Sequence, residues 1–408
     1  MNTPKIRFKG FKDDWEQRKL DTVAKFSKGS GYSKGDLIET GTPIILYGRL
    51  YTKYETSISD VDTYVEAKEG SVYSKGGEVI VPASGETAED IARAATVDKS
   101  GILLGGDLNV VMPNEDINSA FLAISISNGN SQRELAKKAQ GKSVVHIHNE
   151  EIRNLIVPFP IKAEQNRIVD YFSTLDHLIT LHQRKCDETK QLKKFMLQKM
   201  FPKNGEKNPE IRFEGFTDAW EQRKLIDYLD VSNEKNKKGD YKKTDVLSVS
   251  GEVGIVNQIE FQGRSFAGVS VENYGIVNEG DVVYTKSPLK ANPYGIIKTN
   301  KGKAGIVSTL YAVYKPKENT DSNFVQIYFE LDSRMNSYMH PLVNKGAKND
   351  MKVSDENALK GNVTFPKINE QKAISNFITE LDHLITLHQR KCEKLKALKK
   401  FMLQNMFI

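Results

Sequence analysis

Cysteine is scarce in this sequence, because Cys186 and Cys392 are the only two among 408 residues. Two thiols cannot build the disulfide framework of a small secreted domain, so a reducing cytoplasm is the expected location. No apolar run approaches the roughly 18–20 residues that a membrane span needs. The first residues, MNTPKIRFKGF, also lack the apolar core of a signal peptide. We therefore expect a cytoplasmic protein with no membrane segment.

A strong excess of one charge is missing as well. The formal net charge is +6, from 59 lysines and arginines against 53 aspartates and glutamates. This modestly basic balance permits a nucleic-acid partner without requiring one. The length of 408 residues predicts two or three domains.

A long duplicated segment dominates what is present. LDHLITLHQRKC occurs unchanged at 175–186 and at 381–392, and the match extends without a gap over 159–201 and 365–407. Apolar residues recur in both copies at steps of four and three, which is typical of a coiled-coil helix. Each helix would be about 55–60 Å long at 1.5 Å per residue. The residues predicted to pair the helices are Ile168, Phe172, Leu175, Ile179 and His182 in the first copy, and Ile374, Ile378, Leu381, Ile385 and His388 in the second.

A second duplicated piece precedes each body of the chain. PKIRFKGFKDDWEQRKLDTV at 4–23 matches PEIRFEGFTDAWEQRKLIDY at 209–228. Together with the helices it indicates one tandem duplication that covers the entire sequence. The expected parts are a body at 1–158, a long helix at 159–201, a linker at 202–208, a second body at 209–364 and a second long helix at 365–408.

The two bodies are predicted to be mixed α/β modules, so the fold class is α+β. Short β-rich runs bounded by Gly, Asn, Asp and Pro recur in them, such as GEVIVPASG and GDVVYTKSP. A faint common skeleton relates 77–80 to 280–283, and Pro113 with Phe121 to Pro316 with Phe324. The remaining sequences differ. We expect one fold used twice, with different surfaces.

Catalytic patterns are weak in this chain. Asp60 or Asp62 with Glu66-Ala67-Lys68 imitates the acidic set of a metal-dependent nuclease, but its polar surroundings favour a solvated charge run. His146 and His148 lack the further ligands that a zinc site needs. We therefore predict no enzyme and no metal site.

Loops that favour nucleic acid occur in both bodies. Segments 27–35, 47–54 and 84–87 combine cations with aromatic or small polar residues, and 235–243, 286–290 and 344–349 are basic loops of the second body. Arg can pair bidentately with guanine, Glu can accept from cytosine, and Lys or Tyr can hold phosphates. A solvated basic loop is the alternative at each place. The residues predicted to contact DNA are Lys28, Ser30, Tyr32, Lys34, Tyr47, Arg49, Tyr51, Lys53, Ser84, Glu86, Thr87, Lys286, Ser287, Lys290, Lys345, Lys348 and Asn349.

Taken together, the repeated segments resemble a known family. The FP-x-x-x-EQ segments at Phe159 and Phe365, the LDHLITLHQRK cores and the RF-x-GF-x-x-x-WEQRKL segments at Arg7 and Arg212 resemble the specificity subunit of a type I restriction-modification system. The resemblance covers the full length of the chain. It implies two target-recognition domains, each reading one half of a split sequence in double-stranded DNA. It also implies that the two helices pair as an antiparallel coiled coil and set the spacing between the half-sites.

The same resemblance implies the partners and the division of chemistry. Two methyltransferase (modification) subunits would dock on the helices and carry S-adenosylmethionine, and restriction-translocase subunits would complete the nuclease. The specificity subunit itself would bind no cofactor and perform no catalysis. The exposed Gln-Arg-Lys faces at 183–185 and 389–391 are candidate docking surfaces.

Two other functions stay open at this point. A non-catalytic protein-interaction scaffold with duplicated helices would bind its partners without a steep dependence on salt. A nuclease or methyltransferase in its own right would show activity as an isolated chain with metal or S-adenosylmethionine.

Overall fold

The computed structural model describes residues 3–141, 144–203, 205–286, 292–345 and 351–407. The chain forms two compact units. Unit 1 consists of residues 1–183 and 390–408, and unit 2 consists of residues 184–389. Each unit therefore contains one body, the first half of the helix that follows this body and the second half of the other long helix.

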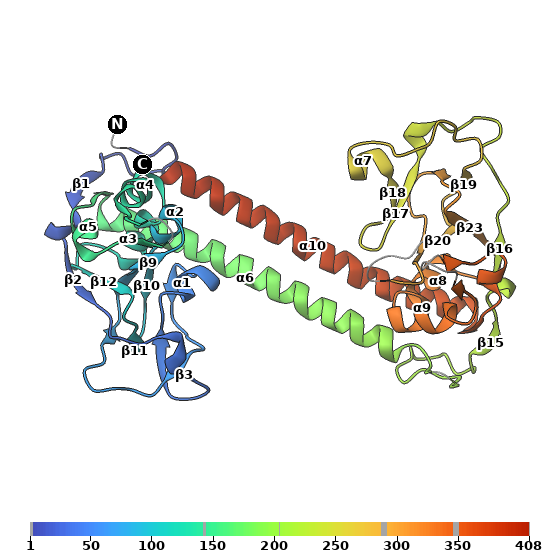
Figure 1. Ribbon diagram of the computed structural model, residues 1–408, viewed down its shortest axis with the longest axis horizontal. Helices are drawn as coiled ribbons and strands as arrows, with labels where there is room; N and C mark the ends of the chain where they lie inside the picture. Colours follow the sequence, from blue (N-terminus) through green and yellow to red (C-terminus); the bar gives the residue numbers. More distant parts are fainter. Residues whose placement is uncertain (1–2, 142–143, 204, 287–291, 346–350, 408) are drawn as a thin grey trace. The chain divides into compact units, whose positions relative to one another are not determined.

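Unit 1 is built around antiparallel strands whose order is not their order in the chain. The central sheet runs β2 (Ala24–Lys28), β12 (Leu108–Pro113), β8 (Glu78–Pro82), β10 (Ala95–Val97) and β5 (Ser57–Ile58), the last pair being parallel (Figure 1). A second sheet runs β3 (Leu37–Ile38), β6 (Tyr64–Val65), β4 (Thr42–Ile45), β11 (Ser100–Leu104) and β7 (Tyr73–Lys75). The pairs β1 (Glu16–Lys19) with β14 (Ile156–Phe159) and β9 (Ser84–Gly85) with β13 (Val145–His146) complete it. Its own helices are α1 (Arg49–Thr52), α2 (Ala88–Ile91), α3 (Ser119–Ile126), α4 (Gly129–Lys138) and α5 (Asn149–Arg153).

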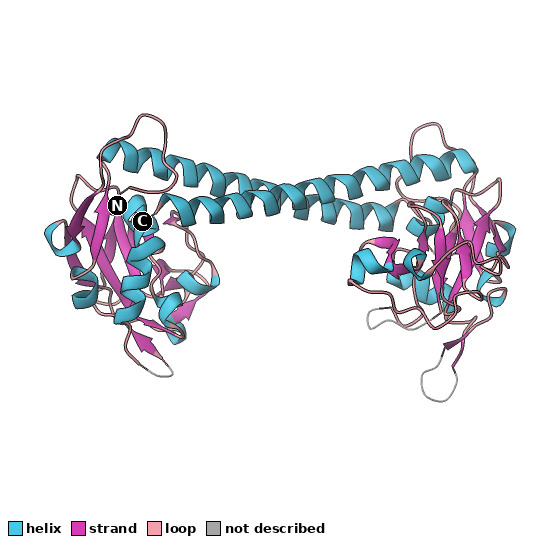
Figure 2. Ribbon diagram, turned by 90° about the horizontal axis from the view of Figure 1, so that it is seen from above, coloured by secondary structure: helices cyan, strands magenta, loops and turns pink. Residues whose placement is uncertain are grey.

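Unit 2 repeats the central part of this plan. Its sheet runs β16 (Leu229–Val231), β23 (Tyr311–Pro316), β20 (Val282–Thr285) and β21 (Ile297–Thr299), and all pairs are antiparallel. The two-stranded pairs are β15 (Glu221–Lys224) with β26 (Asn362–Phe365), β17 (Leu247–Ser250) with β18 (Gly254–Asn257), β19 (Gly275–Val277) with β22 (Gly305–Val307) and β24 (Asn344–Lys345) with β25 (Met351–Lys352). Its own helices are α7 (Gln258–Gln262), α8 (Ser322–Tyr328) and α9 (Asp332–Met339). Figure 2 shows the strands of each unit flanked by helices.

The predicted common skeleton is confirmed at the strands β8 and β20. Gly77 and Gly280 precede these strands with φ angles of 89° and 87°, which residues other than glycine rarely adopt. The following carboxylates turn back onto the backbone: Glu78 accepts from the N–H of Lys75 at 2.5 Å, and Asp281 accepts from the N–H of Asn278 at 2.7 Å. The two bodies thus share one mixed α/β fold.

The two long helices are α6 (Lys162–Lys199) and α10 (Ile368–Met406). They pack antiparallel, as ion pairs in both units show. In unit 1 Lys399 Nζ lies 2.5 Å from Asp176 Oδ1, and in unit 2 Lys193 Nζ lies 2.6 Å from Asp382 Oδ1. The antiparallel coiled coil that the family resemblance implied is therefore confirmed. None of the helices in the described part of the chain is long and apolar enough to cross a membrane.

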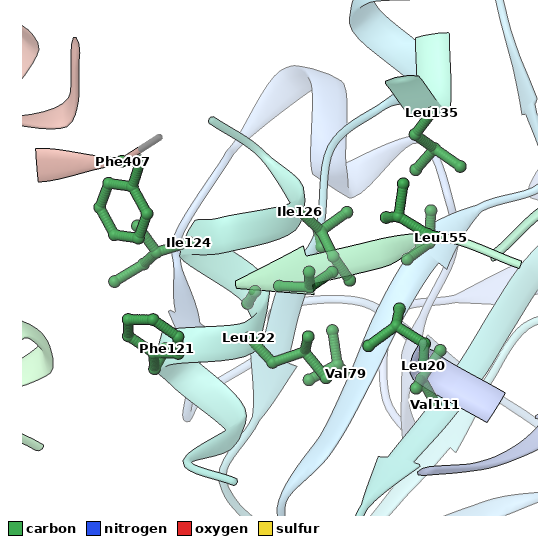
Figure 3. Packing of buried hydrophobic residues seen from close by; sticks show 14 of the residues in the cluster. Leu20, Val79, Val111, Phe121, Leu122, Ile124, Ile126, Leu135, Leu155 and Phe407 are labelled. Carbon is green, nitrogen blue, oxygen red and sulfur yellow. The ribbon is translucent and has the colours of Figure 1, made fainter. Parts of the chain in front are cut away.

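The end of each long helix completes the core of the other repeat's body. Phe407, after α10, is buried in unit 1 beside Trp15 and Phe121, at ring-centroid distances of 6.2 and 5.9 Å. Figure 3 shows Phe407 at one side of this core, near Phe121. Phe201, after α6, lies 5.9 Å from Trp220 in unit 2. Burying one such phenylalanine contributes about 1.5–3 kcal/mol, so both helix ends stabilise the units they enter.

Candidate nucleic-acid interface

A duplicated ion pair holds the start of each long helix against its own body. The guanidinium of Arg7 donates from Nε and Nη2 to the two carboxylate oxygens of Glu164, both at 2.7 Å. Arg212 and Glu370 repeat this geometry with the same two distances. Both carboxylates are buried, and these hydrogen bonds raise the pKa of Arg7 and Arg212. Bidentate pairs of this kind fix orientation as well as distance, so the direction of each helix is tied to its body.

The glutamine after each of these carboxylates ties the helix to a second segment. Gln165 donates to the carbonyl of Pro160 at 2.9 Å and accepts from the N–H of Asn118 at 2.8 Å. Gln371 does the same with Pro366 at 2.9 Å and Asp321 at 2.9 Å. The Glu-Gln pair therefore explains why the helix starts and the RF-x-GF segments are duplicated together.

The helix-pairing residues predicted from the sequence are all buried or half-buried on α6 and α10. Ile168, Phe172 and Leu175 are buried in unit 1, and Ile374, Ile378 and Leu381 are buried in unit 2; Ile179, His182, Ile385 and His388 are half-buried. The cysteine thiols are buried too. Cys186 Sγ donates to the carbonyl of Ile385 at 3.9 Å, and Cys392 Sγ donates to that of Ile179 at 4.0 Å.

Two predicted segments of the first body meet at the two-stranded pair of β9 and β13, which we call the ribbon. Tyr51 donates its hydroxyl to the carbonyl of Ser84 at 2.8 Å, and the Ser84 hydroxyl lies 3.2 Å from His146 Nδ1. A Cβ atom on Gly85 would lie 2.8 Å from the Tyr51 hydroxyl, so any larger residue here would have to displace the Tyr51 side chain. Glu86 follows the ribbon and is exposed. An exposed carboxylate directly after a strand pair can accept a hydrogen bond from a base edge.

The predicted residues next to the ribbon differ in whether they bond within the protein or face solvent. Thr87 caps α2 by accepting from the N–H of Asp90 at 3.1 Å. Tyr47 is 38% exposed, and its ring lies 6.3 Å from that of Tyr51. The sequence offered His146 only as part of an incomplete metal site. Its place beside Ser84 depends on a strand pairing between residues 62 positions apart.

Arg49 is buried, and both of its terminal guanidinium nitrogens bond within the protein. Its guanidinium donates to Asp62 and Glu55, each at 2.8 Å, and to the carbonyl of Asp60 at 2.9 Å. Lys53 also donates to Asp62, at 2.9 Å, and these two cations lower the pKa of Asp62 to about 2. Arg49 thus holds the loop in place, whereas the side chain of Lys53 is exposed to solvent.

The glycine-rich basic segment at 27–35 divides in the same way. Lys28 and Lys34 are exposed. Tyr32 is buried, and its hydroxyl accepts from the N–H of Lys68 at 2.7 Å. The Ser30 hydroxyl accepts from the N–H of Val72 at 3.1 Å. Of the residues predicted to contact DNA in this segment, the two lysines are therefore the ones that are exposed.

In the second body, much of the prediction falls outside the described residues. This applies to Ser287, Lys290, Lys348 and Asn349, and of Lys345 only the backbone in β24 is described. Lys286 directly follows β20 and donates to Asp355 at 2.9 Å. Its position at the end of β20 corresponds to that of the ribbon after β8 in unit 1.

The nuclease-like carboxylates of the first body are held separately by different cations. Asp60 pairs with Lys99 at 2.5 Å, and Asp62 pairs with Arg49 and Lys53. Lys68 of the same set pairs with Asp36, a carboxylate outside it, at 2.5 Å. Within the described ranges, no group of three His, Cys, Asp or Glu side chains is arranged to hold a metal ion.

Exposed apolar side chains on the long helices were missed by sequence reasoning. Leu192 and Phe195 of α6 are 41% and 45% exposed in unit 2, and their repeat equivalents Leu398 and Phe401 of α10 are 41% and 53% exposed in unit 1. We call each pair an apolar face. The signal was present, because both pairs are duplicated unchanged although they lie outside the pairing positions.

Comparisons with known proteins agree with this architecture. The family model of the type I restriction modification DNA specificity domain matches residues 12–191 and again residues 217–397. A specificity subunit assigned to the MjaX type I restriction enzyme of Methanocaldococcus jannaschii is 25% identical over 419 residues, covering 96% of this chain and 92% of that protein. The specificity subunit of the MjaVIII type I restriction enzyme of the same organism is 21% identical over 408 residues, covering 96% and 91%.

A solved structure shares the fold. The crystal structure of a type I restriction-modification system S subunit from M. genitalium has a TM-score of 0.59 to this chain at 12% sequence identity. The match covers 100% of this chain and 99% of the other.

Proposed function

Because this chain belongs to the family of the type I restriction modification DNA specificity domain, with two copies of that domain, we propose that its two bodies read the two halves of a bipartite target in double-stranded DNA. The observation that carries the proposal is a shared sheet with unlike surfaces. Strand β8 leads to the ribbon with Ser84 and the exposed Glu86, whereas the equivalent β20 leads to Lys286, which is paired with Asp355. Side chains that differ in charge prefer different base edges, so the two half-sites differ in sequence.

The long helices would set the distance between the half-sites. Two observations support this part of the proposal. Each helix start is fixed to its body by the buried pairs Arg7–Glu164 and Arg212–Glu370, and the helices pack antiparallel in both units. Because each helix is fixed to its body at its start, the length of the helix pair would determine the distance between the two half-sites.

The chain would perform no chemistry of its own and would bind no cofactor. Two methyltransferase subunits would supply S-adenosylmethionine, restriction-translocase subunits would complete the nuclease, and the complex would act in the cytoplasm. The engagement of Asp60 and Asp62 by Lys99, Arg49 and Lys53 supports this assignment, because these carboxylates then serve the loop structure.

The decisive experiment is a map of adenine methylation in a host without its own system. With this chain and its methyltransferase co-expressed, we expect a split motif that is absent when this chain is omitted. A methyltransferase that copurifies with the chain and is active, yet produces no motif, would favour a protein-interaction scaffold instead.

A variant of one reading residue sharpens the same map. Glu86→Ala removes an exposed carboxylate that caps no helix and fills no core. We expect relaxed sequence preference at one position of one half-site, since a good base contact is worth about 1–3 kcal/mol of discrimination. The other half-site and the spacer should stay unchanged. Changes in both half-sites would contradict a separate reader in each body.

We further propose that each apolar face docks one methyltransferase subunit. The two faces carry the same residues at equivalent places, Leu192 with Phe195 and Leu398 with Phe401, which fits two copies of one partner. Such exposed leucine and phenylalanine side chains are suitable anchors for a protein interface.

The double substitution Leu398→Ser with Phe401→Ser should therefore remove one of the two methyltransferase subunits. Both side chains are largely exposed, so the fold should tolerate the change. Native mass spectrometry of the co-expressed complex would show the loss of one subunit. Leu398→Met with Phe401→Leu keeps the apolar surface and serves as the matched control. Unchanged stoichiometry in the serine variant would rule out this face as the docking site.

A further inference from the structure

A basic groove of about 860 Å³ lies in unit 1, where α4 meets the end of α10 and the first residues of the chain. Its lining cations are Lys5, Arg133, Lys396, Lys399 and Lys400. Among the described residues that line it, none carries a carboxylate. The lining is therefore strongly positive, although the net charge of the whole chain is only +6.

Most of this charge faces solvent. Lys5, Arg133, Lys396 and Lys400 are exposed, whereas Lys399 is half-buried and pairs with Asp176 at 2.5 Å. The nearest acidic residue along α4 is Glu134, which pairs with Lys137 at 2.7 Å and does not line the groove. Several uncompensated cations at one concave place raise the local concentration of anions.

The equivalent place in unit 2 is arranged differently. Arg334 of α9 lies over the ring of Phe201 at 4.5 Å and donates to the carbonyl of Leu197 at 3.2 Å, so it covers the end of α6. The repeat equivalent of Lys5 is Glu210, which pairs with Lys199 and, at 2.5 Å, with Lys203. These pairings lower the pKa of Glu210 to about 2. The duplication thus kept the frame and changed the charge at one end.

We propose that the groove of unit 1 is a phosphate-binding site that holds the DNA backbone independently of sequence. This inference rests on the proposed function, since it assumes that the chain binds DNA. Phosphate is favoured over an acidic protein segment because protein docking relies on exposed apolar anchors. The large apolar residues that line the groove are the half-buried Leu403 and the buried Phe407, and the exposed Leu398 and Phe401 do not line it. Lysines act as point charges on flexible stems, which suits backbone phosphates. The groove gives unit 1 a contact with the phosphate backbone of DNA that unit 2 lacks at its equivalent place.

The test compares two lysine pairs related by the duplication. Lys396→Ala with Lys400→Ala removes groove charge, and Lys190→Ala with Lys194→Ala removes the equivalent charge from α6; all four lysines are exposed. DNA affinity is measured for the complex with its methyltransferase subunits over a range of salt concentrations. Each lost phosphate contact reduces the slope of log K against log [salt] by about 0.9. We expect the groove variant to lose about one to two units of slope on specific and non-specific duplexes alike, and the control to lose none.

A second variant gives unit 1 the residue that unit 2 has at the equivalent position. Lys5→Glu places a carboxylate beside the remaining groove cations, as Glu210 does in unit 2, and should also lower the slope. Equal slopes for wild type, groove variant and control would overturn the proposal. Loss of a methyltransferase subunit with an unchanged slope would assign the groove to a protein partner. Stabilisation of wild type by inorganic phosphate, absent in the groove variant and again with an unchanged slope, would assign it to a free anion. A wild-type complex with no preference for its motif would instead refute the proposed function itself.

Discussion

Glu370→Gln should lower the free energy of unfolding of unit 2 by about 2–3 kcal/mol. Breaking a buried ion pair costs about 3–5 kcal/mol, and the partial exposure of the Arg212 side chain, at 15%, reduces this figure. The substitution also weakens the acceptor of the buried Trp220 indole, which donates to Glu370 at 3.3 Å. Glu164→Gln should cost unit 1 less, because no indole hydrogen bond is lost there. Urea unfolding followed by tryptophan fluorescence measures both effects.

The chain offers a probe for each unit, since its two tryptophans are Trp15 in unit 1 and Trp220 in unit 2. Trp15→Phe leaves a reporter in unit 2, and Trp220→Phe leaves one in unit 1. The control is Asp218→Asn, which breaks the exposed pair with Lys367 and should change stability by less than about 1 kcal/mol. If Glu370→Gln and Asp218→Asn had equal effects, the buried pair would not fix the helix to the body.

The long helices were predictable because their signal is local. A repeat of apolar residues every three or four positions indicates a helix directly, and an identical second copy indicates its partner. The structure places α6 at Lys162–Lys199 and α10 at Ile368–Met406, inside the predicted segments. The first residue of each segment, Phe159 or Phe365, is instead the last residue of the strand β14 or β26, which pairs with the WEQRK strand β1 or β15.

The link between the duplicated segments was not predicted. Arg7 and Glu164 are separated by 157 positions, and periodicity carries no information about contacts at that range. A signal existed, because Arg and Glu are duplicated together in both copies. The same limit explains why the place of Phe407 in the core of unit 1 was missed, since most of that core is formed by residues 15–175, far earlier in the chain.

The reading residues were the least predictable part. Loops that hold themselves together use the same side chains as loops that bind DNA, so composition could not separate Arg49, which binds three loop oxygens, from the exposed Lys53. Likewise Tyr32 is buried while Lys28 and Lys34 of the same segment are exposed. The difference depends on where Asp60, Asp62 and Lys68 lie, and only the folded structure supplies that.

Insertion of seven residues into both long helices should change the spacer of the target and leave both half-sites unchanged. Suitable places are after Gln183 and after Gln389, where the two units divide the helices. Seven residues keep the coiled-coil face in register and add about 10 Å at 1.5 Å per residue. At 3.4 Å per base pair this lengthens the spacer by up to about three base pairs. Methylation mapping of the insertion variant gives the new motif directly.

The same insertion in α6 alone is the matched control for this experiment. It shifts α6 against α10, so Lys193 and Asp382 on one side of the insertion and Asp176 and Lys399 on the other can no longer both keep their pairs. We expect the single insertion to destabilise the helix pairing and abolish methylation of any split motif. If the double insertion methylated the original motif with its original spacer, the helices would not set the spacing. If it changed the bases of either half-site, the helices would take part in reading sequence, and the division between rigid frame and separate readers would be wrong.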